Sequence, residues 1–288
     1  RGVTCFSTSS TTAAGNTAMG WGSMINNTTG YASVAMGLSS LAAQTTAGYS
    51  TAVGYSALAQ NTTASFNTAV GGLALYSNTT GAENVAVGVN TLDSNTTGSN
   101  NTGLGTAALA ANTTAANNTG VGHQALAANT TGTANVAVGQ GSLATNITGD
   151  GNTAVGKSTL NVNTASNNTA VGKDALGSNT NGQQNTVVGA LAGDGVTGGD
   201  GNTAMGYASL SGAVTGDYNA GFGYNALGSV TTSSSNSGLG TNAGFNITTG
   251  TNNLCLGRDA GIGGSPANIT TQSNLIALGN NSITAAYI

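Results

Sequence analysis

Residues 50–63 read Ser-Thr-Ala-Val-Gly-Tyr-Ser-Ala-Leu-Ala-Gln-Asn-Thr-Thr, and versions of this phrase recur throughout the 288-residue chain. Sixteen copies have a glycine at the place of Gly54, and thirteen of the fifteen intervals between these glycines are 17 residues long. One interval is 16 residues, from Gly156 to Gly172, and the last is 22, from Gly257 to Gly279. A unit this short cannot bury its apolar face alone and must stack on its neighbours. The spacing therefore predicts an all-β protein, a parallel β-solenoid of about sixteen 17-residue coils.

Each phrase begins with an alternating pattern that indicates a short strand ending at the glycine. Thr51 and Val53 share one face of this strand, and Ala52 lies on the other. Because the residue before the glycine is apolar in every copy, we expect the face of Thr51 and Val53 to point into the core. Leu58, four residues after Gly54, marks a second apolar position. We expect it on a short second strand folded back over the first, with the Asn-Thr-Thr stretch as the return corner.

An asparagine falls four residues before the glycine in most copies, as at Asn67, Asn84 and Asn101. In stacked coils these side chains lie one above another, so we expect their amides to form a hydrogen-bonded ladder. The 16-residue copy lacks one residue between Leu160 and Asn168. We place this deletion in a corner, because a deletion inside a strand would reverse its two faces.

Composition excludes several classes of partner. Only 4% of the residues are charged, with four Lys and Arg against eight Asp and Glu, so we expect no nucleic-acid binding. No apolar run approaches the roughly 18 residues of a membrane span, so we expect no membrane insertion.

Cys5 and Cys255 would lie about 70 Å apart in a straight solenoid, too far for a disulfide. A chain that starts at Arg1 is expected to be a processed or truncated piece.

The pattern divides the chain into three parts. Residues 1–15 are an N-terminal cap or linker, 16–189 are regular coils, and 190–288 are divergent coils with a longer insert at 258–273 that contains Pro266. Two large apolar side chains per coil make a thin core for so long a chain. This favours lateral association of several chains, as a homotrimer or a higher homo-oligomer.

The phrase Asn-Thr-Ala-Val-Gly-x-x-Ala-Leu, followed by Asn-Thr-Thr-Gly, resembles the repeats of bacteriophage tail-fibre and appendage proteins. It is also similar to the head repeats of trimeric autotransporter adhesins, which form a left-handed parallel β-roll in a three-chain bundle. Residues 274–284 resemble the segment that precedes an endosialidase-type intramolecular chaperone domain. The resemblance implies a homotrimeric fibre for host attachment, on a virion tail or a cell surface, with a surface glycan or other host receptor as partner.

We expect no catalytic residue, cofactor or metal ligand. His123 is the only histidine and is interpreted as a surface residue. The Gly-Asp-Gly patches at Asp150, Asp194 and Asp200 faintly resemble calcium-binding β-roll repeats, but they do not recur in every coil and are interpreted as turn residues. A fibre-borne depolymerase ranks last among the functions considered, because paired carboxylates are missing.

The position directly after the glycine varies more than its neighbours, which indicates that it faces outward. Exposed aromatic rings there can stack on sugar rings, and a variable corner without a ligand is the alternative. The candidate ligand-contact column is Trp21, Tyr55, His123, Lys157, Lys173, Tyr207, Tyr224 and Arg258.

Asn-x-Thr stretches match the acceptor pattern for N-glycosylation, and the alternative is that they are polar corners. The candidate acceptors are Asn27, Asn61, Asn78, Asn95, Asn112, Asn129, Asn146, Asn246 and Asn268.

The expected function is that of a structural, adhesive fibre that presents a receptor- or glycan-contact surface and catalyses no reaction. Two alternatives remain. One is a self-assembling extracellular fibril, with or without glycans. The other is a solenoid that binds ice or another crystal surface through ranks of threonines, which requires Thr62-Thr63, Thr79-Thr80, Thr96-Thr97 and Thr113-Thr114 to form a flat exposed plane.

Overall fold

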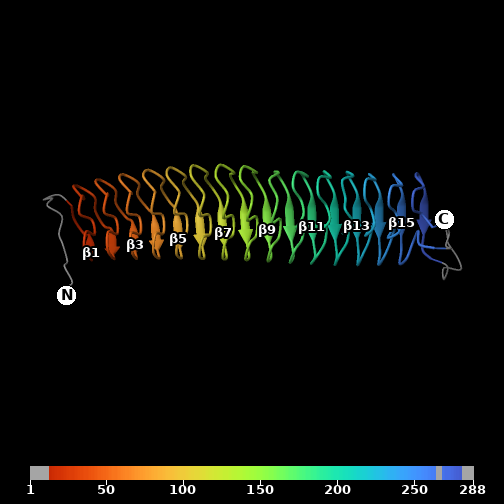
Figure 1. The fold of residues 1–288 in the computed structure, drawn as a ribbon, viewed down its shortest axis with the longest axis horizontal. Helices are drawn as coiled ribbons and strands as arrows, with labels where there is room; N and C mark the ends of the chain where they lie inside the picture. Colours follow the sequence, from red (N-terminus) through yellow and green to blue (C-terminus); the bar gives the residue numbers. More distant parts are fainter. Residues whose placement is uncertain (1–12, 264–267, 281–288) are drawn as a thin grey trace. The chain divides into compact units, whose positions relative to one another are not determined.

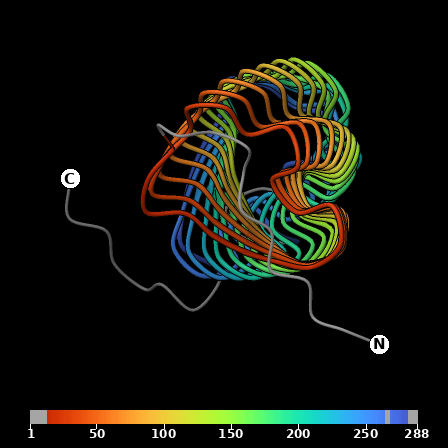
Figure 2. The same cartoon turned by 90° about the vertical axis from the view of Figure 1, so that its left-hand side faces the viewer.

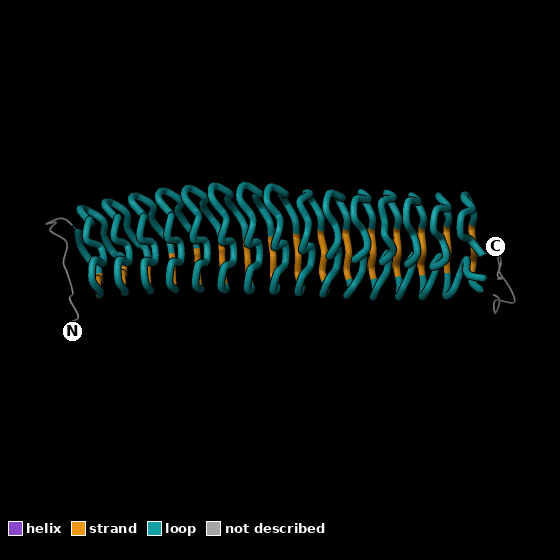
Figure 3. The backbone as a smooth tube through the Cα atoms, in the orientation of Figure 1, coloured by secondary structure: helices purple, strands orange, loops and turns teal. Residues whose placement is uncertain are grey.

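The computed structural model describes residues 13–263 and 268–280. The chain divides into two compact units, the first ending at Asp150 and the second beginning at Gly151. Every coil contributes one three-residue strand, and turns make up most of the rest (Figure 3). Cys5, Pro266 and residues 1–12 and 281–284, which the sequence analysis considers, lie outside the described residues.

The first unit contains eight parallel strands in sequence order (Figure 1). Each residue pairs with its counterpart one repeat later, so Thr51, Ala52 and Val53 lie beside Thr68, Ala69 and Val70. Viewed along the stack, successive coils of this unit follow one outline (Figure 2). The strands are β1 (Thr17–Met19), β2 (Val34–Met36), β3 (Thr51–Val53), β4 (Thr68–Val70), β5 (Val85–Val87), β6 (Thr102–Leu104), β7 (Thr119–Val121) and β8 (Val136–Val138).

The second unit has the same architecture, and its irregular repeats leave the strand register intact. Across the 16-residue repeat Thr153 still pairs with Thr169, and across the 22-residue repeat Leu254 pairs with Ile276. The length changes therefore fall outside the strands, as predicted for the deletion. The strands are β9 (Thr153–Val155), β10 (Thr169–Val171), β11 (Thr186–Val188), β12 (Thr203–Met205), β13 (Ala220–Phe222), β14 (Ser237–Leu239), β15 (Leu254–Leu256) and β16 (Ile276–Leu278). The predicted parallel β-solenoid is confirmed in each unit.

The expectation that Thr51 and Val53 point inward is wrong. The middle residue of the strand is the buried one: Ala52 and Ala69 are 0% exposed, whereas Val70 is 36% exposed. Space is the physical reason. Gly120 occupies this middle position in β7, and an added Cβ would lie only 3.2 Å from Cγ of Leu109. The interior therefore admits little more than a methyl group here, and the larger threonine and valine side chains face outward.

A leucine from the turn after most of the strands fills the core instead. Leu58 and its counterparts are fully buried, but the second strand expected around them is not present in the described coils. The backbone is left-handed at Ser56 and Leu58, with φ of 51° at both. Left-handed backbone at alternate residues prevents an extended strand, so this segment forms turns instead. The Leu58 amide donates to the carbonyl of Ala74 in the next coil at 3.0 Å.

Two asparagine ladders line the interior. The predicted one is confirmed: Oδ1 of Asn67 accepts the backbone N–H of Asn84 at 2.9 Å, and Asn84 Oδ1 accepts that of Asn101 at 2.9 Å. The second ladder is formed by the asparagine of each Asn-Thr-Thr corner. Asn78 Nδ2 donates to Asn61 Oδ1 at 2.9 Å and to the carbonyl of Gly81 at 2.9 Å. These buried amides satisfy one another and the backbone of the corner.

The glycine that ends each strand is required on two grounds. Gly54 has a φ of 136°, which L side chains rarely adopt. An added Cβ would also lie 2.5 Å from the carbonyl oxygen of Gly71 in the next coil. The recurrence of this residue therefore reflects both backbone conformation and the close approach of stacked coils.

Candidate functional site

The outward-pointing side chains of the strands form a continuous surface in each unit, which we call the outer strand face. In β4 it consists of Thr68 and Val70, which flank the buried Ala69. In the first unit the last strand residue is apolar in all eight strands, and no outward strand residue is charged. The exposed members include Met19 at 40%, Met36 at 38% and Leu104 at 46%. The face is thus an array of apolar and hydroxyl side chains in register.

In the second unit this face becomes more apolar toward β16. Threonine is replaced by Leu254 in β15 and by Ile276 in β16, which are 38% and 68% exposed. Smaller outward residues on the preceding strands, Ala220 in β13 and Ser237 in β14, leave an apolar hollow of about 360 Å³ beside Leu254. It is lined by Ala220, Phe222, Ser237, Gly238, Leu239 and Leu254. The hollow offers room for a side chain from outside the unit.

The column directly after the glycine is exposed at all eight candidate ligand-contact residues, Trp21, Tyr55, His123, Lys157, Lys173, Tyr207, Tyr224 and Arg258. The structure brings two of them together, because the rings of Tyr207 and Tyr224 stack with centroids 5.5 Å apart. Two cations pair with the carboxylate of the following residue: Lys173 Nζ lies 2.7 Å from Asp174 Oδ2, and Arg258 Nε lies 3.2 Å from Asp259 Oδ2. The hydrogen bond that Lys173 donates to the Asp174 carboxylate raises the pKa of Lys173. Contact with a ligand stays a prediction for this column.

Most of the candidate glycosylation sites are buried. The seven from the regular corners are at most 2% exposed, and their Nδ2 atoms donate inside the fold, as Asn112 Nδ2 does to Asn95 Oδ1 of the neighbouring coil at 2.8 Å. A glycan on such a nitrogen has no space in the folded coil, so the corner interpretation applies to Asn27, Asn61, Asn78, Asn95, Asn112, Asn129 and Asn146. Asn246 is half-buried and donates to Asn268, which is exposed.

The threonine pairs do not form the flat plane that crystal-surface recognition at the corners requires. Thr62 is half-buried, and its hydroxyl donates to the carbonyl of Thr79 at 3.1 Å. The same bond recurs from Thr79 to Thr96 at 3.0 Å and from Thr96 to Thr113 at 3.1 Å. Only the second threonine of each pair is exposed. The corner therefore presents one column of free threonines.

The aspartates of the Gly-Asp-Gly patches take part in turns. Asp150 Oδ1 accepts the backbone N–H of Thr133 at 2.6 Å, and Asp200 Oδ1 accepts that of Gln183 at 2.7 Å. Partial burial raises the pKa of Asp194. Among residues 13–263 and 268–280, no group of three or more His, Cys, Asp or Glu side chains is placed to hold a metal ion. His123 lies exposed on its corner.

Exposed aromatic residues also gather at a position that the sequence analysis did not single out, five or six residues before the strand-ending glycine. Tyr31 lies edge-on to Tyr49 with ring centroids 5.0 Å apart, and Tyr49 stacks on Phe66 at 5.2 Å. In the second unit Tyr218 lies five residues before Gly223 and is 66% exposed. The signal in the sequence is weak, because the same position also holds Glu83 and several asparagines and glycines.

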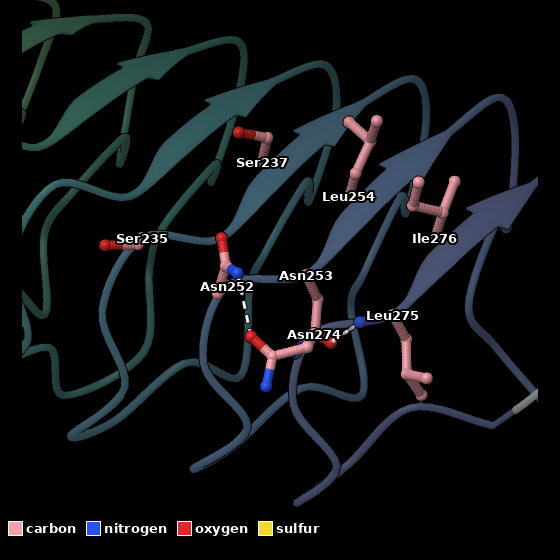
Figure 4. Close-up of a pocket in the computed structure, with 8 residues that line it drawn as sticks. All are labelled: Ser235, Ser237, Asn252, Asn253, Leu254, Asn274, Leu275 and Ile276. Carbon is pink, nitrogen blue, oxygen red and sulfur yellow. Dashed lines mark hydrogen bonds between the residues drawn. The ribbon is translucent and has the colours of Figure 1, made fainter.

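A second hollow, of about 350 Å³, lies in the last coils beside the residues that occupy the coil position of Tyr218 (Figure 4). It is lined by Ser235, Ser237, Asn252, Asn253, Leu254, Asn274, Leu275 and Ile276. Its walls combine hydroxyl and amide groups with branched apolar side chains.

Comparison with protein-family models, with curated proteins and with solved structures finds no match to this chain. Within the described part of the chain, no helix is long and apolar enough to cross a membrane.

Proposed function

We propose that this protein is a structural fibre component whose copies associate side by side through the outer strand face. The observation that supports this most directly is the exposed apolar residue at the end of the strand in coil after coil. We further propose that the fibre is extracellular, as the shaft of a phage tail fibre or a cell-surface appendage, and that it acts by contact, with no reaction catalysed. The repeat phrase that resembles such proteins supports this part of the proposal.

The size of the face is suited to association. Eight strands spaced about 4.8 Å apart, each presenting about 10 Å of its length, give a flat area of about 380 Å² per unit. The largest apolar patch on a typical soluble monomer covers about 300 to 600 Å² and is often functional. This face is of similar extent, although threonine hydroxyls supply part of it. Because the outward strand residues carry no charge, burying them requires no desolvation of ions.

The interior supports a mechanical role. Within each unit, backbone hydrogen bonds tie each coil to the next, and the buried asparagine ladders add side-chain bonds in the same direction. Stability in such an array is the sum of coil and neighbour terms. A stiff stack that exposes a uniform lateral surface is suited to holding copies in parallel.

Native mass measurement and sedimentation of the whole chain test the proposal. We expect a homotrimer or larger homo-oligomer, and we expect Val70→Lys on β4 to reduce its mass while the circular dichroism of the coils is retained. Thr63→Lys is the matched control, because Thr63 is exposed in the coil that leads into β4 but lies at a corner away from the face. A wild-type chain that stays monomeric at micromolar concentration contradicts the proposal.

Recognition of ice or another crystal surface is a second candidate, now through the outer strand face. The observation in its favour is that outward threonines lie in register in neighbouring strands, as Thr51 does with Thr68 and Thr102 with Thr119. Val34, Val85 and Val136 interrupt this rank, and this is why the candidate ranks second. Thermal hysteresis in the wild-type protein that disappears in Thr68→Lys supports it, and its absence from the wild type excludes it.

A further inference from the structure

A row of four residues runs alongside the last coils of the second unit and combines a left-handed backbone with exposed side chains. Tyr218, Ser235, Asn252 and Asn274 have φ of 57°, 62°, 54° and 62°. Each donates its backbone N–H to the preceding coil, as Tyr218 does to the carbonyl of Asp200 at 2.9 Å. Asparagine adopts this left-handed conformation readily, whereas a bulky aromatic residue does so at a cost.

Tyr218 is the member of this row that folding explains least. Its side chain is 66% exposed, so it gains little from burial. The ring lies against the backbone of Gly201, where an added Cβ would come within 2.7 Å of Cδ1. Because Gly201 has no side chain, the ring of Tyr218 fits against its backbone, while most of the tyrosine faces solvent. An exposed aromatic ring held in one position is suited to stacking on a ligand.

The hollow of about 350 Å³ continues this row beyond Tyr218 (Figure 4). Asn252 Nδ2 donates to Asn274 Oδ1 at 2.8 Å, which fixes both amides. This bond leaves Oδ1 of Asn252 as an acceptor and Nδ2 of Asn274 as a donor for a ligand. Leu254 and Ile276 supply an apolar wall next to these groups. A ligand that fits must therefore carry both hydroxyl groups and C–H faces, as sugars do.

Charge narrows the class of sugar. The side chains that line the hollow are uncharged. Beside Tyr218, the carboxylates of Asp200 and Asp217 are oriented by backbone donors: Asp200 Oδ1 accepts the N–H of Gln183 at 2.7 Å, and Asp217 Oδ1 accepts that of Asp200 at 2.8 Å. Two neighbouring carboxylates repel an anionic ligand and accept hydrogen bonds from hydroxyl groups.

We propose that this row and its hollow bind an uncharged oligosaccharide. One pyranose ring stacks on Tyr218, and the following sugars lie along Ser235, Asn252 and Asn274 with their hydroxyl groups on the amides and their C–H faces on Leu254 and Ile276. The inference refines the contact surface of the proposed fibre. It does not depend on association of the chains, because every residue of the site belongs to one unit.

A panel of glycans that pairs neutral oligosaccharides with their sialylated or sulfated forms tests this proposal, with calorimetric titration of any glycan that binds the full chain. We expect binding of a neutral glycan and at least about ten-fold weaker binding of its anionic form. Tyr218→Ala should weaken binding at least about ten-fold, the loss expected when one stacking contact is removed. Asn252→Asp tolerates the same backbone but removes the amide donor that fixes Asn274, and it should weaken binding as well.

Tyr49→Ala is the matched control. It removes a ring at the same left-handed coil position, with φ of 57° and 52% exposed, but from the first unit and not from the unit that holds the hollow, and it should leave the affinity unchanged. Circular dichroism melting of each variant shows whether the fold is retained, and native mass shows whether association is retained. Loss of binding with the mass unchanged supports the proposal. No neutral glycan bound, wild-type affinity in Tyr218→Ala and Asn252→Asp, or loss of binding in Tyr49→Ala alone overturns it, whatever the oligomeric state.

Discussion

Asn78 donates a hydrogen bond from its side-chain nitrogen to Oδ1 of Asn61 at 2.9 Å, the first step of a buried ladder that continues coil by coil to Asn146. The ladder does not extend back to Asn27. Gln44 stands at the intervening position, fully buried, and neither of its side-chain polar atoms has a hydrogen-bond partner. Its extra methylene moves the amide away from the line on which the asparagines meet.

Gln44→Asn should therefore stabilise the first unit. The shorter side chain places its amide in line with Asn27 and Asn61, so two unpaired buried atoms gain partners, worth about 1 to 3 kcal/mol in the free energy of unfolding. Urea or thermal denaturation followed by circular dichroism measures the change. Gln60→Asn makes the same substitution at an exposed position and should stay within about 0.5 kcal/mol of wild type. A Gln44→Asn protein no more stable than wild type would show that the ladder geometry does not govern this site.

The reversed strand faces lead to a second prediction. Ala69→Val adds two methyl groups where the middle position faces the core, and it should destabilise the coil by about 1 to 3 kcal/mol through overpacking. Val70→Ala removes a similar volume from the outer strand face and should change the unfolding of an isolated chain by less than about 1 kcal/mol. Denaturation under conditions that dissociate oligomers compares the two. A larger loss for Val70→Ala would restore the original assignment of faces.

Much of this fold follows from the sequence, and the limits have physical causes. The repeat length, the strand that ends at Gly54 and the ladder through Asn67 follow from periodicity and from stacking like residues on like. Alternation alone shows that Thr51 and Val53 oppose Ala52, but it does not show which side is inside. The informative signal was volume: the middle strand position holds only small or apolar residues, never a polar side chain such as threonine.

The candidate binding row was harder to predict. Its position holds Tyr218, Ser235 and Asn252 in successive coils, so neither hydrophobicity nor charge marks it. What unites these residues is a left-handed backbone, which follows from how each coil turns back toward the next strand. A single sequence does not reveal that geometry when the residue is a tyrosine, because tyrosine rarely adopts it.

Two core residues, Val187 and Gly193, compensate for each other in size, and this leads to a third prediction. Val187 replaces the usual alanine in the middle of β11, and Gly193 replaces the usual leucine of the following turn. An added Cβ at Gly193 would lie 3.2 Å from Cγ2 of Val187, so the valine occupies part of the space that a leucine fills elsewhere. The two positions share one volume.

Val187→Ala alone should open a cavity and cost about 1 to 3 kcal/mol, and Gly193→Leu alone should clash with Val187. The double variant restores the common alanine–leucine pair, and leucine adopts a left-handed backbone at the equivalent Leu176 and Leu210. We expect a favourable coupling of about 1 to 3 kcal/mol in a double-mutant cycle measured by denaturation. Additive single effects would mean that the two side chains do not compete for space.

The buried thiol of Cys255 makes stability depend on pH. It occupies the middle of β15, is 0% exposed, and burial raises its pKa from 9.0 to about 11. The unfolded chain therefore loses this proton at lower pH than the folded chain. The contribution of the thiol to stability is fully present below pH 9 and is lost as pH rises through about 11.

Denaturation of wild type and Cys255→Ala at a series of pH values isolates this effect, because alanine is the residue that the middle position usually holds. Wild type should lose on the order of 2 to 3 kcal/mol more than the variant between pH 8 and pH 11, the free-energy equivalent of two pKa units. Alkylation of Cys255 in the native state at pH 8, measured by peptide mapping to separate it from Cys5, should be slow and should accelerate on addition of urea, because the reactive thiolate is scarce in the fold. Parallel pH profiles for the two proteins, or rapid alkylation of Cys255 without denaturant, would place this thiol at the surface and remove it from the core of β15.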